Sequence, residues 1–298
     1  MRAIPWRHME PLALTLWCAL LAVAGSLLTQ WPLRLDGLPA AGRPALMALA
    51  LVVFLAALLR PWQKGFARRW TVYRLGPPKA SAGGFILLLV AIPVLNYGGI
   101  AVFTALTEPE QVWVPVLEGV LAQPGGLWML LIMLLLAAPL IEELLVRGRL
   151  QYQVGQRWGV PAAIAISATV FAWLHGLPQL VPVYVAFGVL LGVAVWLTGS
   201  VWTGVLIHAL HNGATFGLFL LASAMDVAPP EATEAAEDTA ALLQAGGSAL
   251  LLGAALLALA LRIGRWPGRK TGGPVRWQPL VWIGPPLLAL NAAPFITG

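Results

Sequence analysis

The chain has 298 residues, of which 59% are hydrophobic and 10% are charged, and its formal net charge at pH 7 is +6. A soluble protein carries about a quarter charged residues, so this composition excludes an ordinary water-soluble domain. The mean hydropathy of +0.82 leads to the same conclusion. In so apolar a chain the positive charge indicates basic loops at an anionic membrane surface. We therefore expect the lipid bilayer as a partner, and no nucleic acid.

Eight apolar runs have about the length that crosses a bilayer. The first is flanked by Arg2 and Arg7 and is longer than the core of a signal peptide, so we interpret it as an uncleaved helix. The sequence predicts an all-α, polytopic membrane helix bundle with one integral membrane domain over residues 1–298. The expected helices lie near residues 11–29, 41–59, 83–107, 127–156, 161–175, 180–198, 201–224 and 241–261.

Residues 262–298 form a basic tail that includes a short apolar segment from Leu280 to Leu290. Pro285 and Pro286 lie in this segment, and proline removes backbone donors and kinks a helix. We therefore expect an interfacial or re-entrant segment here, and no ninth span.

The basic residues are distributed unevenly between the two sides of the predicted bundle. Lys and Arg near the ends of spans collect on the cytoplasmic side. Of the 18 basic residues, Arg147 and Arg149 lie within the fourth run, and Arg34 and Arg43 fall on one side of the bundle. All the others fall on the opposite side. This distribution predicts an integral protein of a bacterial plasma membrane with both termini in the cytoplasm. The oligomeric state stays open.

Charged or ionisable residues interrupt the fourth, fifth and seventh apolar runs, and such residues are costly in a membrane and usually functional. In the fourth run, Glu143 and Arg147 are four residues apart and can form an ion pair on one helix face. Glu142 lies off that face and is left free, as a general base must be. The alternative is that these residues merely mark the end of the fourth helix.

The spacing around two predicted turns brings the polar groups to a similar depth. Glu142 lies 17 residues before Gly159 and His175 lies 16 residues after it. If both arms are helical, each group is roughly 24 to 26 Å from the turn. A second turn, after the sixth helix, brings His208 and Asn212 towards the same level. We expect these four side chains to converge on a cavity within the bilayer that opens to the cytoplasmic side.

His208 and Asn212 are four residues apart on the seventh helix, so their side chains share one face. Polar residues in membrane bundles also serve as hydrogen-bonding contacts between helices, and this alternative stays open for each of them. The role of His211 is open as well.

Three other features indicate packing. Cys18, the single cysteine, lies inside an apolar run and leaves no possibility of a disulfide framework. We expect Asn96 to serve packing as well. Gly188 and Gly192 have the spacing that permits close contact between membrane helices.

The three polar segments together resemble the CPBP family of intramembrane proteases. That family includes CAAX prenyl endopeptidases and bacterial proteins linked to bacteriocin processing and immunity. The resemblance covers roughly residues 85–224, with the catalytic helices four to seven at 127–224. Its pattern is Glu-Glu-x-x-x-Arg, then Phe-x-x-x-His, then His-x-x-x-Asn, which correspond to Glu142, Glu143 and Arg147, to Phe171 and His175, and to His208 and Asn212.

The resemblance implies a role for each matched residue. Glu142 and His175 would activate water, and His208 and Asn212 would stabilise the oxyanion. The remaining pair of the first motif, Glu143 and Arg147, would give structural support. Zinc stays open as a cofactor: a catalytic zinc needs about three protein ligands, and Glu142, His175 and His208 are the candidates.

The sequence thus predicts an intramembrane endopeptidase that cleaves a peptide or protein substrate at the membrane. The alternative is a non-catalytic immunity or transport protein that uses the same buried polar residues for binding.

Overall fold

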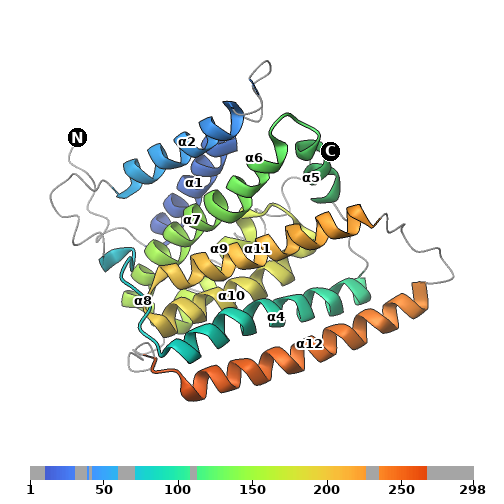
Figure 1. Cartoon of the computed structure of the whole chain (residues 1–298). Coiled ribbons are helices and arrows are strands. Elements are labelled where there is room, and N and C mark those ends of the chain that lie inside the picture. The colour runs from blue at the N-terminus through green and yellow to red at the C-terminus, as the bar shows by residue number, and fades with distance from the viewer. Residues whose placement is uncertain are drawn as a thin grey trace, which may run out of the picture.

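The computed structural model describes residues 11–30, 39, 42–59, 71–107, 113–225 and 235–266, and every regular element among them is a helix (Figure 1). The predicted segment from Leu280 to Leu290 lies outside the described residues. The helices are α1 (Pro11–Gln30), α2 (Gly42–Leu59), α4 (Ala82–Thr107), α5 (Trp113–Leu121), α6 (Gly126–Ile132), η3 (Met133–Ala137), α7 (Ala138–Glu142), η4 (Glu143–Gln151), α8 (Tyr152–Trp158), α9 (Val160–Leu174), η5 (Pro178–Leu180), α10 (Val181–Thr198), α11 (Val201–Ala224) and α12 (Ala235–Ile263).

Six of the described helical segments are long and apolar enough to cross a membrane, and the segments Thr15–Gln30 and Val160–Leu174 are apolar but shorter. Together they coincide with the eight predicted runs. The prediction of a polytopic, all-α membrane bundle is confirmed, and the chain is an integral membrane protein. Its bacterial origin and the side on which its termini lie stay predictions.

One continuous helical segment of 33 residues, Gly126–Trp158, crosses the bundle and carries the first motif. It consists of α6, α7 and α8 with two π-helical stretches, η3 and η4, between them. Pro139, near the start of α7, has no backbone N–H to donate to the turn before it. π-Helical turns interrupt the regular α-helix and are frequent at functional sites. Here they bracket Glu142.

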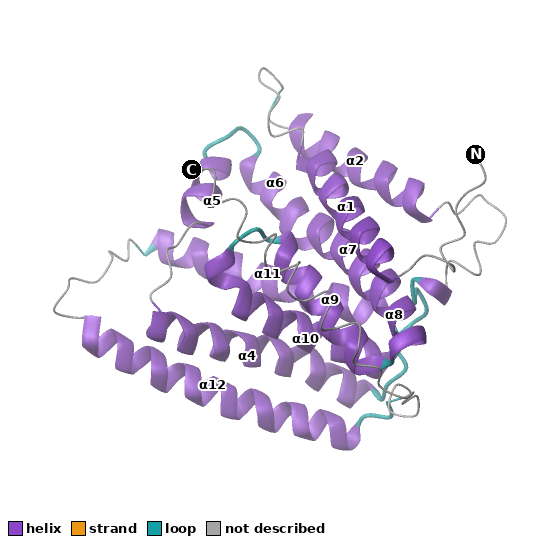
Figure 2. Ribbon diagram, turned by 180° about the vertical axis from the view of Figure 1, so that it is seen from behind, coloured by secondary structure: helices purple, strands orange, loops and turns teal. Residues whose placement is uncertain are grey.

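The helices α4 and α12 lie side by side along their length (Figures 1 and 2). Glycines make this approach possible. A Cβ atom added at Gly98 would lie 2.8 Å from the backbone nitrogen of Leu250, and one at Gly253 would lie 2.7 Å from Cγ of Leu95. The small residues thus let the two backbones approach, as they do in other membrane helix pairs.

The segment Thr71–Ala80 joins several helix ends at one end of the bundle. The Lys79 amide donates to the carbonyl of Thr198 at 3.0 Å, and the Val201 amide donates to the carbonyl of Arg74 at 3.0 Å. In Figure 2 this segment follows the edge of the bundle beside α8. We call this end, where α8 and α10 finish and α11 begins, the basic end, because its described basic residues are Arg74, Lys79, Arg157, Arg262 and Arg265.

Candidate active site

A fully buried ion pair stands at the centre of the three motifs. Nη1 of Arg147 donates to Oε1 of Glu143 at 2.8 Å, and both side chains are 0% exposed. The predicted pair is therefore present. Nδ1 of His208 donates to the same carboxylate oxygen at 3.2 Å, so the first and third motifs are in direct contact. This second contact was not foreseen from the sequence.

The ring of Phe171 contacts residues of all three motifs. The guanidinium of Arg147 lies 4.2 Å from the ring centroid, a cation–π contact. The ring centroids of His175 and His208 lie 4.7 and 5.5 Å away, both in edge-on arrangements. Phe171 itself is 0% exposed. It therefore fixes the relative positions of Arg147 and the two histidines.

His175 occupies the C-cap position of α9, one residue beyond the helix. Its Nδ1 donates to the carbonyl of Phe171 at 2.8 Å, and its ring stacks on Tyr184 with the centroids 3.9 Å apart. The proton on Nδ1 leaves Nε2 as the unprotonated nitrogen of the neutral ring. Oε2 of Glu142 is buried without a hydrogen-bond partner, and so is Oε2 of Glu143.

Two polar side chains of η4 reach the backbone of α10. Arg147 donates through Nη2 to the carbonyl of Gly188 at 3.3 Å, and Gln151 donates through Nε2 to the carbonyl of Gly192 at 2.9 Å. A Cβ atom at Gly188 would lie 2.9 Å from Cα of Ala168. The predicted role of the two glycines in close helix contact is therefore confirmed. Their backbone carbonyls also accept hydrogen bonds from η4.

Asn212 does not form its hydrogen bond with the Glu143–Arg147 ion pair. Its Nδ2 donates to the carbonyl of Leu134, in the π-helical stretch η3, at 3.0 Å. One of the two amide hydrogens is thus engaged. Asn212 and Glu142 are both partly exposed, whereas His208 is 2% exposed. The amide of Asn212 therefore contacts the same long helical segment that carries Glu142, at a point about two helical turns before Glu142.

A second polar group adjoins the site from α4. Nδ2 of Asn96 and Nε2 of His211 are 3.3 Å apart, and the amide donates to this nitrogen. The hydroxyl of Tyr97 donates to the carbonyl of His211 at 2.9 Å. The expectation that Asn96 serves only packing is therefore wrong. The sequence signal that could have revealed this contact was a polar residue in the middle of an apolar helix.

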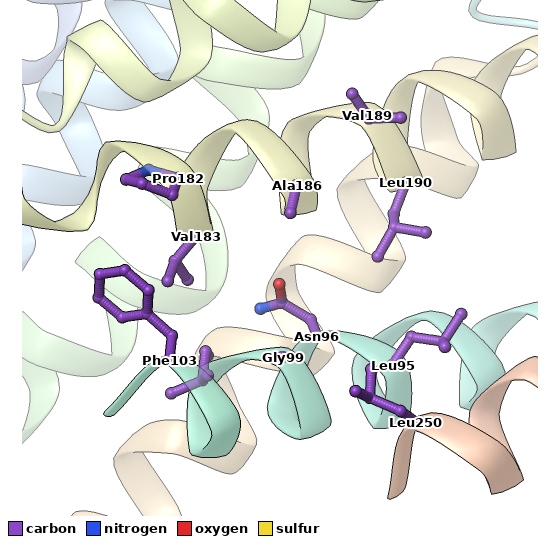
Figure 3. A pocket seen from close by; sticks show the side chains of 11 residues that line it. Leu95, Asn96, Gly99, Phe103, Pro182, Val183, Ala186, Val189, Leu190 and Leu250 are labelled. Atoms are coloured by element: carbon purple, nitrogen blue, oxygen red, sulfur yellow. The ribbon is translucent and has the colours of Figure 1, made fainter. Parts of the chain in front are cut away.

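A cavity of about 460 Å³ lies between α4 and α10 (Figure 3). Its wall is apolar except for Asn96, which points between the two helices in Figure 3. None of the predicted catalytic residues lines this cavity. Among the described residues, the contact of Asn96 with His211 links this cavity to the site.

Gly204 gives the Glu143 carboxylate the space that it occupies. A Cβ atom at position 204 would lie 2.5 Å from Oε2 of Glu143 and 2.9 Å from Cγ2 of Val195. We expect Gly204→Ala to destabilise the protein by about 1–3 kcal/mol through overpacking. Gly217→Ala on the same helix is the matched control, because a Cβ atom there meets nothing within 4 Å. Thermal unfolding in detergent measures both, and equal unfolding temperatures would show that position 204 tolerates a methyl group.

The three candidate zinc ligands are not gathered into a metal site. Within the part of the chain that the structure describes, no three His, Cys, Asp or Glu side chains are arranged to hold a metal ion. In this arrangement Glu142, His175 and His208, which the sequence left open as candidate ligands, do not form a metal site.

Residues 124–214 match the family model described as Rce1-like, type II CAAX prenyl endopeptidase. The matched segment is about 30% of the chain and contains all three motifs. The resemblance inferred from those motifs is thereby confirmed, and the family is one of membrane proteases. No curated protein and no solved structure matches the chain.

Proposed function

We propose that this membrane protein, which matches the Rce1-like CAAX prenyl endopeptidases over residues 124–214, hydrolyses a peptide bond of a membrane-associated peptide or protein. The observation that carries the proposal is the difference between two neighbouring carboxylates. Oε2 of each carboxylate is buried without a hydrogen-bond partner, but Oε1 of Glu143 is bound by Arg147 and His208, whereas Glu142 has no such ion pair in the described part of the chain. A carboxylate that no cation holds is available to take a proton.

In the proposed reaction, Glu142 accepts a proton from water, and the oxygen of that water attacks the carbonyl carbon of the substrate. The bond of Nδ1 of His175 to Phe171 supports a positioning role for this ring, because the unprotonated Nε2 can accept a hydrogen bond from the water. When the tetrahedral intermediate collapses, the C–N bond breaks and Glu142 returns the proton to the leaving nitrogen.

Asn212 and His208 are the proposed donors to the oxyanion. The amide of Asn212 has a second N–H besides the one bonded to Leu134. His208 donates through Nε2 only when both ring nitrogens carry protons, because Nδ1 already donates to Glu143. Glu143 is the counter-ion of that form. We therefore assign Glu143 and Arg147 to the positioning of His208.

The test is a comparison of the peptide products in membranes from cells that produce the wild-type protein or His175→Phe. Phenylalanine keeps a ring for the stack on Tyr184 but removes both ring nitrogens. We expect new peptide termini to appear with the wild-type protein and to be lost with the variant. Trp173→Phe, on the last turn of α9, is the control and should retain them.

The same comparison also tests the alternative of a non-catalytic immunity or transport protein. A binding protein would generate no cleavage products in either membrane preparation. Identical products with and without the wild-type protein would therefore contradict the proposed peptidase activity.

A further inference from the structure

The imidazole ring of His175 lies where α9 ends and the helix no longer supports it. His175 is the C-cap residue, and Gly176, which follows it, is exposed and has a φ of +64°. The torsion that turns the ring of a histidine is broad and roughly two-fold, so rotamer preference alone does not fix the plane of the ring. The direction of the unprotonated Nε2 must therefore be set by the groups that pack against the ring.

Two aromatic rings among the described residues pack against His175. Phe171 contacts it edge-on, with the centroids 4.7 Å apart and an interplanar angle of 60°. The carbonyl of Phe171 also accepts the proton of Nδ1, which holds one nitrogen but leaves the plane free to tilt about that bond. Tyr184 stacks on the face of the imidazole at 3.9 Å, with an interplanar angle of 21°. This nearly parallel ring is the contact that restricts the tilt.

The helix that carries Tyr184 is itself held close to the site. Tyr184 is the fourth residue of α10 and lies four residues before Gly188, so the two residues share one helix face. The carbonyl of Gly188 accepts a hydrogen bond from Nη2 of Arg147, and a Cβ atom at Gly188 would lie 2.9 Å from Cα of Ala168 in α9. One turn from Tyr184, α10 is therefore fixed against both η4 and α9.

We infer that Tyr184, which belongs to none of the three motifs, is a positioning residue for His175: the face of its ring holds the imidazole plane so that Nε2 is directed at the attacking water. The inference rests on the proposed peptidase function for the role of His175, and on the stack for the choice of Tyr184. Because the ring face carries this role, phenylalanine at position 184 should replace tyrosine, and an aliphatic residue should not.

The stack can be measured without any assay of cleavage. The chain contains four histidines, so nuclear magnetic resonance of isotope-labelled histidine in detergent gives few ring signals, and the signal lost in His175→Phe belongs to His175. The ring current of a stacked neighbour shifts the carbon-bound ring protons upfield. We expect this shift in the wild-type protein and in Tyr184→Phe, and its loss in Tyr184→Leu. An unchanged signal in Tyr184→Leu would overturn the inference and leave the peptidase proposal standing.

The second measurement is the steady-state cleavage of a substrate identified from the membrane products. Misplacement of a catalytic group by about 1 Å can cost about 10²-fold in rate, so we expect Tyr184→Leu to lower kcat by about 10- to 100-fold with KM unchanged. Tyr184→Phe should keep the wild-type kcat. Tyr184→Met, which removes the ring but fills more of its volume, is made alongside and should behave like Tyr184→Leu.

Phe85→Leu is the matched control for the loss of an aromatic ring. Phe85 is the fourth residue of α4 and is partly exposed, as Tyr184 is, but it lies at the basic end of the bundle, where α4 begins. Its exchange should leave the His175 signal, kcat and KM unchanged.

The remaining outcomes separate positioning from other roles. A wild-type kcat in Tyr184→Leu, or an equal loss in Tyr184→Phe, would contradict positioning by the ring face. A raised KM with an unchanged kcat would mean that Tyr184 contacts the substrate instead. A merely structural role would lower the unfolding temperature and leave kcat per folded molecule unchanged. Absence of cleavage by the wild-type protein would contradict the peptidase proposal itself, a result distinct from all of these.

Discussion

Replacement of Glu142 by glutamine should lower the rate of peptide-bond cleavage by about 10²- to 10⁴-fold, the usual contribution of a general base. Glutamine has nearly the same shape but cannot accept the proton from water. Because Oε2 of Glu142 has no hydrogen-bond partner, the exchange deprives no protein donor of its acceptor at that oxygen. We therefore expect the unfolding temperature in detergent to stay unchanged. Cleavage is measured with a substrate identified from the membrane products.

Glu118→Gln is the matched control for the loss of one carboxylate. Glu118 is exposed on α5, outside the site, and its exchange should change neither cleavage nor stability. Cleavage by Glu142→Gln at the wild-type rate would show that another group takes the proton.

Replacement of Arg147 by methionine should destabilise the protein by about 3–5 kcal/mol, because it leaves the buried Glu143 carboxylate without its cation. Glu143→Gln should have a similar effect, since it leaves the guanidinium unpaired. The double variant Glu143→Gln/Arg147→Met removes both charges. We expect it to be destabilised by less than the sum of the two single variants, as measured by unfolding in detergent.

Additive effects in this double-mutant cycle would mean that the two charges do not interact, contrary to the 2.8 Å contact. The cycle also separates stability from catalysis. A double variant that is as stable as the wild-type protein but cleaves poorly would support the positioning of His208 by Glu143. Undiminished cleavage by such a variant would leave Glu143 with a purely structural role.

The membrane spans could be predicted from the sequence because a run of apolar side chains long enough to cross lipid has few other uses. The seventh run, 201–224, coincides with α11, and the others agree to within a few residues except at the start of α12. The ion pair of Glu143 with Arg147 was equally predictable, because both partners belong to one helix and the spacing alone brings them together.

The contacts between helices could not be predicted in the same way. The bond of His208 to Glu143 depends on how α11 is rotated against a helix that contains two π-helical stretches, and periodicity alone does not show where these occur. The contact of Asn96 with His211 depends on the packing of α4, outside all three motifs.

The absence of a side chain at Gly204 also indicates how the third motif should be defined. Gly204, His208 and Asn212 follow one another at intervals of four residues, and the first of them is where the helix leaves room for the carboxylate that holds the second. The pattern is therefore better written as Gly-x-x-x-His-x-x-x-Asn, one helical turn longer. A protein with the shorter pattern but a larger residue at the first position would have to seat its second glutamate elsewhere. The longer pattern thus separates chains that can build this ion pair from chains that only share its histidine.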